Sequence, residues 1–175
     1  QSKKLPRLRT VIRMGTEKTS GMFNFDDVME RGTKADADRL AVLATVLNPN
    51  DPINIQFTSG TTGTPKGATL SHINILNNAY YSAISMNLTA DDRLCIPVPL
   101  YHCFGMVLGS LVCVSKGATM VFPSEAFDPI STLQAVSDEK CTALHGVPTM
   151  FITELDLPNF KEFDVSHLRT GVIAG

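Results

Sequence analysis

The sequence lacks an apolar run long enough to span a membrane, and it lacks paired cysteines. A transmembrane helix needs about 20 apolar residues, whereas the longest run here, residues 103–114, predicts only a buried helix. Structural zinc sites use ligands paired at short spacing, and no CxxC pair occurs among Cys95, Cys103, Cys113 and Cys141. We therefore expect no membrane span, no metal site, and packing roles for the cysteines in a reducing compartment.

Neither sign of charge dominates the sequence. The 15 Lys and Arg residues and the 17 Asp and Glu residues give a formal net charge of -2. No broad positive field therefore favours a nucleic acid or an anionic membrane as partner. A content of 43% hydrophobic and 18% charged residues, without repeats or low-complexity tracts, is typical of a globular protein. These values exclude disordered and fibrous classes.

Both ends of the chain are typical of the middle of a longer protein. No signal peptide opens the chain, because Gln1 is followed by a basic segment that contains proline. Residues 171–175 predict a short buried strand that enters a glycine turn. Such a turn normally connects to a further element, so we expect the chain to be a piece of a longer protein.

Strand and helix patterns alternate through most of the chain. We predict strands at residues 8–14, 53–57, 93–98, 118–122, 142–144 and 171–174. Apolar residues at helical spacing predict helices at residues 72–86, 104–115, 129–136 and 147–155, with shorter helical patterns in 25–47. Ser71 and Asp128 are good N-caps. This order predicts an α/β fold, a mainly parallel sheet flanked by helices, with active groups at the carboxyl ends of the strands.

A loop rich in hydroxyl side chains and glycine follows the expected strand at 53–57. It reads Thr-Ser-Gly-Thr-Thr-Gly-Thr-Pro-Lys-Gly over residues 58–67. Glycines let backbone N–H groups turn inward, hydroxyls donate to phosphate oxygens, and lysine supplies a compact positive charge. A flexible linker is the plain alternative, but linkers rarely follow a buried strand so abruptly. The P-loop of NTPases requires GxxxxGK and then Ser or Thr, whereas Pro65 precedes Lys66 here and Gly67 follows it.

A second motif, Pro-Val-Pro-Leu-Tyr-His-Cys-Phe-Gly, covers residues 97–105 at the end of another expected strand. A lone histidine is usually structural, but an imidazole at a strand end can donate to an acyl oxygen and gate a pocket. We therefore single out His102. His72, His145 and His167 lie in no such motif, and we expect them to have capping or packing roles.

Together the two motifs resemble those of the adenylate-forming superfamily of acyl-CoA synthetases, luciferases and peptide-synthetase adenylation domains. The resemblance implies that the loop closes over the ATP phosphates, with Thr58, Ser59, Gly60, Thr61, Thr62, Gly63, Thr64, Pro65, Lys66 and Gly67 as binding residues. It implies that His102 is catalytic and contacts the substrate carboxylate. The substrate-binding residues that it implies are Tyr101, His102, Val147, Pro148, Thr149, Gly171 and Gly175.

The resemblance is clearest over residues 51–175, and residues 67–72 with 100–103 are most similar to medium-chain fatty-acyl-CoA ligases. It implies that residues 1–50 end a preceding subdomain and that 51–175 form the phosphate-loop and acyl-pocket part of a large N-terminal domain. The implied reaction joins a carboxylic acid to ATP, with Mg²⁺, to give acyl-AMP and then transfers the acyl group to coenzyme A. A peptide-synthetase adenylation domain and a non-catalytic nucleotide-binding module are the alternatives.

Three elements of the family have no counterpart in the sequence. They are the Tyr-Gly-x-Thr-Glu segment whose Glu holds Mg²⁺, the Asp that binds the ribose, and the catalytic Lys near the carboxyl terminus. We therefore expect this chain alone to be inactive and its full-length parent to be active. The resemblance implies a cytoplasmic location, or the mitochondrial matrix in a eukaryote, and leaves the oligomeric state and the acyl chain length open.

Overall fold

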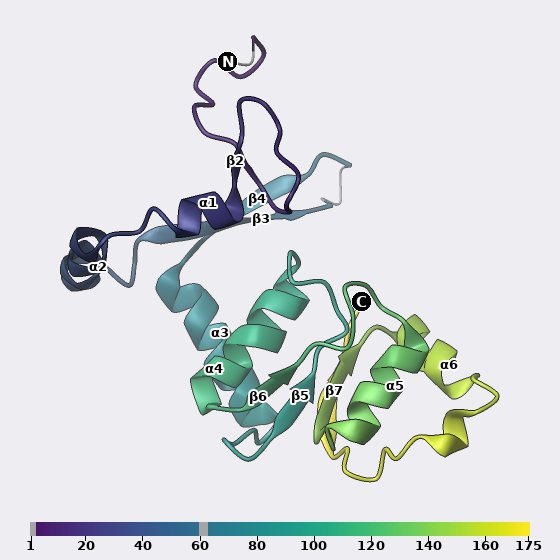
Figure 1. Cartoon of the computed structure of the whole chain (residues 1–175). Coiled ribbons are helices and arrows are strands. Elements are labelled where there is room, and N and C mark those ends of the chain that lie inside the picture. The colour runs from purple at the N-terminus through teal and green to yellow at the C-terminus, as the bar shows by residue number, and fades with distance from the viewer. Residues whose placement is uncertain (1–2, 60–62) are drawn as a thin grey trace. The chain divides into compact units, whose positions relative to one another are not determined.

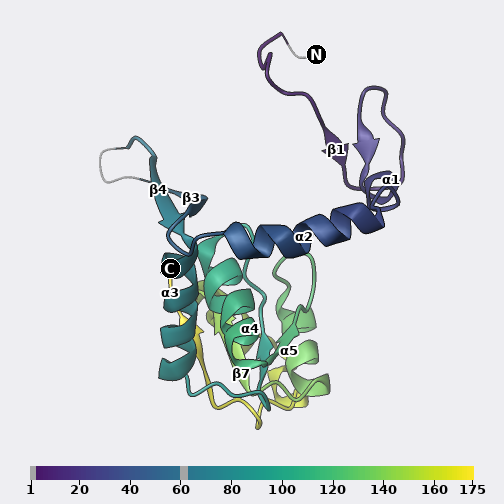
Figure 2. The same ribbon diagram turned by 90° about the vertical axis from the view of Figure 1, so that its left-hand side faces the viewer.

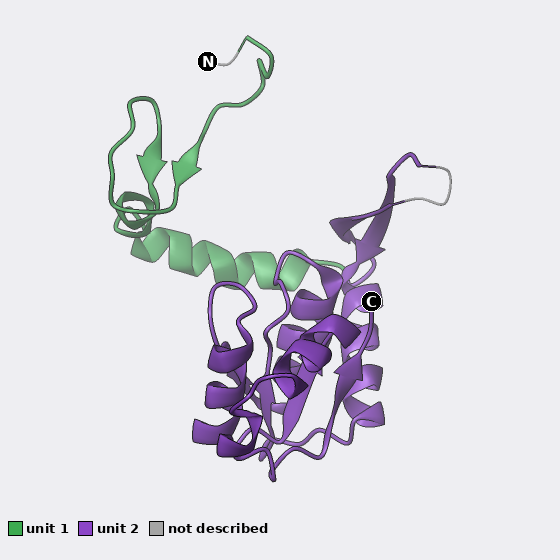
Figure 3. Ribbon diagram, turned by 90° about the vertical axis from the view of Figure 1, so that its right-hand side faces the viewer, with its two compact units in different colours: residues 1–48 green, residues 49–175 purple. Residues whose placement is uncertain are grey.

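The structure is a computed structural model that describes residues 3–59 and 63–175. The chain divides into two compact units, residues 1–48 and 49–175, coloured separately in Figure 3. The boundary falls at the Asn-Pro-Asn-Asp-Pro segment, residues 48–52, that interrupts the helical pattern before it. Each unit is described by itself.

The first unit is small and has little buried surface. Its strands β1 (Ile12–Arg13) and β2 (Phe23–Asn24) pair in parallel, and helices α1 (Phe25–Met29) and α2 (Lys34–Val46) follow. The side chain of Asn24 is buried because its amide donates to the carbonyl oxygens of Gly15 at 2.6 Å and Glu17 at 3.0 Å. Of the strand expected at residues 8–14, only Ile12–Arg13 is present.

The second unit begins with a β-hairpin. Strand β3 (Pro52–Thr58) pairs with β4 (Lys66–Ser71) in an antiparallel register that runs from Pro52 opposite Ser71 to Thr58 opposite Lys66. Two expectations were wrong here. The predicted strand at 53–57 is not part of the parallel sheet, and the loop after it leads into a second strand instead of directly into a helix.

A four-stranded parallel sheet forms the centre of the second unit. Its strands lie in the order β6 (Thr119–Val121), β5 (Arg93–Cys95), β7 (Ala143–Gly146) and β8 (Thr170–Ile173). Helices α3 (His72–Ser85), η1 (Phe104–Leu111) and α4 (Val112–Lys116) cover one face. Helices α5 (Pro129–Asp138) and α6 (Pro148–Leu155) cover the other (Figure 1), and the short helix η2 (Phe160–Glu162) precedes β8. The α/β fold with helices on both faces is confirmed.

The core has one cluster of side chains on each face of the sheet. The larger cluster joins α3, η1 and α4 to β5, and its residues Ala79, Val112 and Cys113 are fully buried. The smaller cluster lies beneath α5 and includes Cys95 and Cys141. Burial also raises the pKa of the Cys113 thiol to about 11. Three of the four cysteines are thus packing residues, as the sequence predicts, and Cys103 is exposed.

Two helices of this unit begin where their capping residues predict. The hydroxyl of Ser71 accepts from the backbone N–H of Asn74 at 3.3 Å, and the Asn74 side chain accepts from the backbone N–H of Ser71 at 3.1 Å. The carboxylate of Asp128 accepts from the N–H of Ser131 at 2.7 Å. Each contact satisfies a backbone donor that has no partner within its helix. Figure 2 shows α3 continuing directly from the hairpin.

The expected helix at 104–115 is present, but its first eight residues form a π-helix, η1, before the α-helical turn α4. Gly105 lies so close to the segment after β5 that a Cβ atom there would be 2.3 Å from the carbonyl oxygen of Pro99. A glycine is therefore needed for this approach. The close contact fixes the start of η1 against the segment that carries His102.

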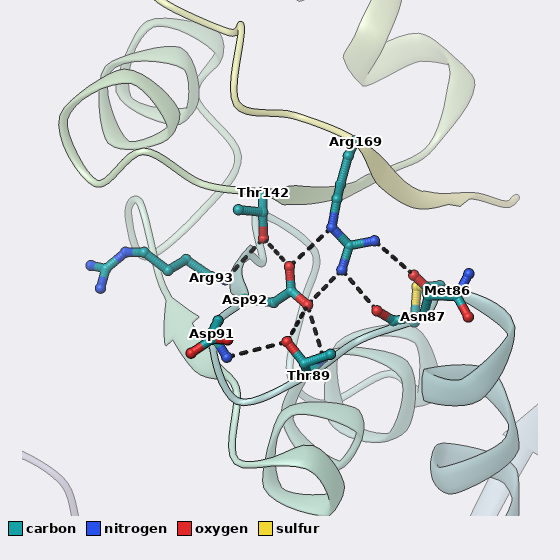
Figure 4. A network of polar contacts seen from close by, with 8 residues as sticks. All are labelled: Met86, Asn87, Thr89, Asp91, Asp92, Arg93, Thr142 and Arg169. Carbon is teal, nitrogen blue, oxygen red and sulfur yellow. Dashed lines mark hydrogen bonds and ion pairs between the residues drawn. The ribbon is translucent and has the colours of Figure 1, made fainter.

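A polar cluster joins the amino ends of three strands (Figure 4). Asp92 precedes β5 and is 4% exposed, and its carboxylate accepts from the hydroxyl of Thr142 at 2.7 Å and the backbone N–H of Thr89 at 2.8 Å. Arg169, which precedes β8, donates to the same carboxylate and to the carbonyl oxygens of Met86 and Asn87. The cluster therefore links the end of α3 to the sheet.

Candidate functional site

The predicted phosphate-binding loop is the turn of the β3–β4 hairpin. Thr58 ends β3 and lies opposite Lys66, which begins β4. Thr58, Ser59, Gly63, Thr64, Pro65, Lys66 and Gly67 are all exposed, and Gly63 has a φ of +81° that favours glycine. Gly60, Thr61 and Thr62 were also predicted to bind and lie outside the described residues. The described part of the loop is thus open to a ligand on its surface.

The strand order places a crevice at the carboxyl end of the sheet. From β5 the chain crosses to β6 on one side, whereas β7 and β8 lie on the other side of β5. The segments that leave β5 and β7 therefore turn toward opposite faces of the sheet. In open α/β sheets such a reversal of strand order is where ligands bind. The segment after β5 carries Tyr101 and His102.

A cavity of about 470 Å³ occupies this position. Four parts of the chain line it: the segment after β5, the helix η1, the start of α6 and the residues after β8. The lining residues are Val98, Pro99, Tyr101, His102, Cys103, Phe104, Leu108, Val147, Met150, Ala174 and Gly175. Of these described residues none is Asp, Glu, Lys or Arg. The cavity is therefore apolar, with the imidazole of His102 and the phenol of Tyr101 as its side-chain polar groups apart from the Cys103 thiol.

The imidazole of His102 is held by the backbone of η1. Its Nδ1 accepts the N–H of Phe104 at 3.1 Å, and the thiol of Cys103 lies 3.8 Å from the same nitrogen. Because a backbone N–H can only donate, the neutral ring carries its proton on Nε2. His102 is therefore oriented by Nδ1, and its Nε2–H remains available to donate to an acyl or carboxylate oxygen.

The structure brings together some of the predicted substrate-binding residues and not others. Tyr101, His102, Val147 and Gly175 all line the cavity. Pro148 and Thr149 begin α6, are exposed, and do not line it. Gly171 lies within β8, where a Cβ atom would be 2.0 Å from the carbonyl oxygen of Leu144. The close pairing of β7 and β8 therefore accounts for that glycine.

Three lining residues that lie on helices were absent from the predicted binding set. Phe104 and Leu108 are four residues apart in a helix that begins at the second motif, so they share one face. Met150 lines the cavity from α6, two residues after Pro148. Helical spacing thus groups Phe104 with Leu108, but which helix face lines the cavity depends on how η1 and α6 pack.

The other histidines lie outside this cavity. His145 is fully buried within β7, which agrees with a packing role. His72 begins α3, and His167 lies 3.9 Å from the carboxylate of Asp164. Over residues 3–59 and 63–175, no group of three or more His, Cys, Asp or Glu side chains is arranged to hold a metal ion. Within the same ranges, no helix combines the length and apolar character needed to cross a membrane.

Comparison with known families gives one match over the whole chain. The model of the family described as AMP-binding enzyme matches residues 1–175. Among curated proteins, the putative acyl-CoA synthetase YngI of Bacillus subtilis is 51% identical over 100% of this chain and 32% of its own length. The mitochondrial medium-chain acyl-CoA ligase ACSF2 of Danio rerio is 47% identical over 100% of this chain and 29% of its own length. The chain thus spans about a third of these relatives.

A solved structure has the same fold over nearly the whole chain. The anthranilate CoA ligase AuaEII, in complex with anthranoyl-AMP, superposes with a TM-score of 0.80 and 25% sequence identity. The match covers 97% of this chain and 32% of that protein. The arrangement of sheet and helices described above is therefore shared with part of a larger protein.

Proposed function

Because the chain belongs to the AMP-binding enzyme family, we propose that it is part of an AMP-forming acyl-CoA ligase. The whole enzyme activates a carboxylic acid with ATP to give acyl-AMP and pyrophosphate, and then transfers the acyl group to coenzyme A. The observation that carries this proposal is the apolar cavity at the strand-order reversal, with His102 in its wall. The similarity to acyl-CoA synthetases and ligases supports it.

The hairpin loop supplies the phosphate site in this proposal. Its hydroxyls and glycines offer donors to phosphate oxygens, and Lys66 offers a positive charge. Charge develops on the phosphates as the acid attacks the α-phosphorus and pyrophosphate leaves. Donors already in place at such a site stabilise this charge without reorganising. The described loop residues are exposed, which suits a loop that closes over a nucleotide.

The cavity supplies the acid site. A carboxylate entering it would accept a hydrogen bond from Nε2 of His102, because Nδ1 is already occupied by the N–H of Phe104. The apolar wall then holds the rest of the acid away from water. A fatty acid suits this wall better than an amino acid, since no lining residue carries a charge that could pair with an ammonium group. This argument favours acyl-CoA ligase over a peptide-synthetase adenylation domain.

Magnesium and coenzyme A are the further groups that the reaction uses. In the described ranges, this chain forms no group of three or more His, Cys, Asp or Glu side chains that could hold the metal. Residues outside this chain would hold the metal, the ribose and coenzyme A. We propose that the enzyme acts in the cytoplasm or in the mitochondrial matrix, and that this chain alone does not turn over.

Pyrophosphate exchange into ATP by the full-length parent tests the proposal. The assay should be run with a panel of carboxylic acids, including octanoate, acetate and several amino acids. Exchange that depends on fatty acids, followed by thioester formation with coenzyme A, is the expected result. Exchange with amino acids alone would select the adenylation-domain alternative. A folded parent that binds ATP but shows no exchange with any acid would be a non-catalytic nucleotide-binding module.

A further inference from the structure

A fully buried histidine lies behind the wall of the acid cavity, against the helix η1. His145 occupies β7 and is 0% exposed. Its Nε2 is 2.7 Å from the carbonyl oxygen of Leu108 in η1, and its Nδ1 is 3.2 Å from the backbone nitrogen of Val172 in β8. The side chain therefore connects the π-helix to two strands of the sheet.

The partners of His145 fix its protonation. A backbone N–H can only donate, so the Val172 contact makes Nδ1 an acceptor. A carbonyl oxygen can only accept, so the Leu108 contact requires the proton on Nε2. The ring is thus a neutral imidazole of one tautomer, and burial lowers its pKa, which keeps it neutral. A second proton would bring two N–H groups against each other at Nδ1.

The groups that His145 holds belong to the cavity wall. Leu108 lines the cavity, and the ring of Phe104, another lining residue, lies 5.4 Å from the His145 ring between centroids. The backbone N–H of Phe104 is the group that orients His102. His145 therefore contacts η1 at Phe104 and at Leu108, the two residues through which η1 lines the cavity, and Phe104 also supplies the donor that fixes His102.

We propose that His145 is a positioning residue that locks η1 against the sheet, and so sets both the acid cavity and the orientation of His102. The inference rests on the proposed function for its kinetic consequence. An apolar side chain of similar size would fill the space but would leave the carbonyl of Leu108 and the N–H of Val172 without the imidazole. A buried polar group without its partner costs free energy. A shift of η1 would lower this cost by letting the Leu108 carbonyl find another partner.

The test compares three variants of the full-length parent. His145→Leu keeps the volume and removes both hydrogen bonds. His145→Gln can donate through its amide nitrogen and accept through its oxygen, so it is the conservative variant. His167→Leu is the matched control, since His167 is exposed and lies outside the cavity. For each we would measure acyl-AMP formation with octanoate, the KM for octanoate and for ATP, and hydrogen exchange of residues 104–111.

His145→Leu should lower kcat/KM for octanoate about tenfold, because part of the free energy of the two lost buried hydrogen bonds would be taken from binding of the acid. The loss should be mainly in the KM for the acid, the KM for ATP should stay within about twofold, and exchange in η1 should become faster. His145→Gln should recover most of both properties. If His145→Leu does not fold, the same quantities are compared between His145→Gln and wild type. A smaller loss of kcat/KM for octanoate and a smaller increase in exchange of η1 are then expected.

Unchanged acid kinetics in a folded His145→Leu enzyme would overturn the proposal. A Gln variant as impaired as the Leu variant would overturn it too, because shape alone would then explain the role of the ring. Equal losses for acid and ATP would indicate general destabilisation and would also count against it. If wild type itself forms no acyl-AMP, the proposed function fails, while hydrogen exchange still reports whether His145 holds η1.

Discussion

Arg169 donates to both carboxylate oxygens of Asp92, with Nε 3.2 Å from Oδ1 and Nη2 2.5 Å from Oδ2. The same guanidinium reaches the carbonyl oxygens of Met86 at 3.2 Å and Asn87 at 2.8 Å. One side chain thus joins the end of α3, the segment before β5 and the segment before β8. A planar fork with five donors suits such a set of acceptors, and a lysine does not.

Arg169→Ala should destabilise the chain by about 2–3 kcal/mol, because Asp92 would stay buried without its cation. Arg169→Lys should recover only part of this, since one ammonium group cannot reach all the acceptors. Urea unfolding monitored by circular dichroism measures both values. Arg39→Ala in α2 is a suitable control, because Arg39 is exposed. Equal stability of wild type and Arg169→Ala would contradict a structural role for the cluster.

Asp92 should make the chain sensitive to acid. Burial acts to raise its pKa, but hydrogen bonds from Thr142, Arg169 and the Thr89 backbone, with the charge of Arg169, bring the pKa below the ordinary 3.8. The stabilisation is therefore complete above pH 3.8 and is lost as the pH falls through the lower folded-state pKa. Asp92→Asn should be less stable at pH 7, and the difference from wild type should shrink below pH 3.8. Unfolding free energies from pH 2.5 to 7 measure this.

Glu154 gives the opposite pH dependence. It lies in α6, is 3% exposed, and burial raises its pKa from 4.5 to about 7. Because the folded state holds this proton more tightly, the contribution to stability falls as the pH rises from 4.5 to 7. Glu154→Gln should remove this fall and should be more stable than wild type at pH 8 by about 2 kcal/mol.

Melting temperatures between pH 4.5 and 8 would measure the effect of Glu154→Gln. Glu162→Gln is the control, since Glu162 is exposed in η2. A Gln variant whose melting temperature follows that of wild type across this range would show that Glu154 does not titrate in the folded chain. A destabilised variant at pH 8 would indicate that the carboxylate has a partner that the amide cannot replace.

The fold could be predicted from the sequence wherever one residue decides a local structure. Ser71 and Asp128 begin helices because their side chains satisfy backbone donors at fixed spacing. Alternating strands and helices likewise indicated the parallel sheet. Strand β4 was missed because Lys66 to Ser71 has no alternating apolar pattern and pairs only with β3. The π-helix was missed because its hydrogen bonds depend on how the helix packs against the segment after β5. Gly105 is a residue whose type indicates that close packing.

The candidate site was predicted where local sequence places a residue at the end of a strand. Tyr101 and His102 lie in the motif at residues 97–105, which follows β5, and Val147 directly follows β7. Leu108 and Met150 reach the cavity only through the packing of η1 and α6. His145 was assigned to packing because no motif surrounds it, and its partners, Leu108 and Val172, are far from it in sequence. Long-range pairing of this kind is not visible in local patterns.

Gly105→Ala should destabilise the chain and disturb the cavity together. The new Cβ would lie 2.3 Å from the carbonyl oxygen of Pro99, so the backbone must shift. Overpacking of this kind costs about 1–3 kcal/mol. Gly32→Ala is the matched control, because its Cβ would meet only the Met29 carbonyl oxygen at an ordinary 3.5 Å. Thermal unfolding of both variants measures the difference, and equal melting temperatures would contradict the close approach.

Lys66→Ala should slow acyl-AMP formation by the full-length parent. Removing one donor that stabilises developing charge typically costs about 3 kcal/mol, or roughly a hundredfold in rate. The effect should appear mainly in kcat for adenylation, measured by single-turnover release of pyrophosphate. Lys161→Ala, an exposed lysine in η2, is the control. A Lys66→Ala enzyme with the wild-type rate would remove the loop from the proposed mechanism.

The polar cluster and the cavity lie at opposite ends of the parallel sheet. Asp92, Thr142 and Arg169 stand before the strands, whereas the cavity lies after them. Substitutions at groups without shared partners usually combine additively. Substitutions that alter only the lining of the cavity should therefore leave the stabilisation by Asp92 and Arg169 unchanged.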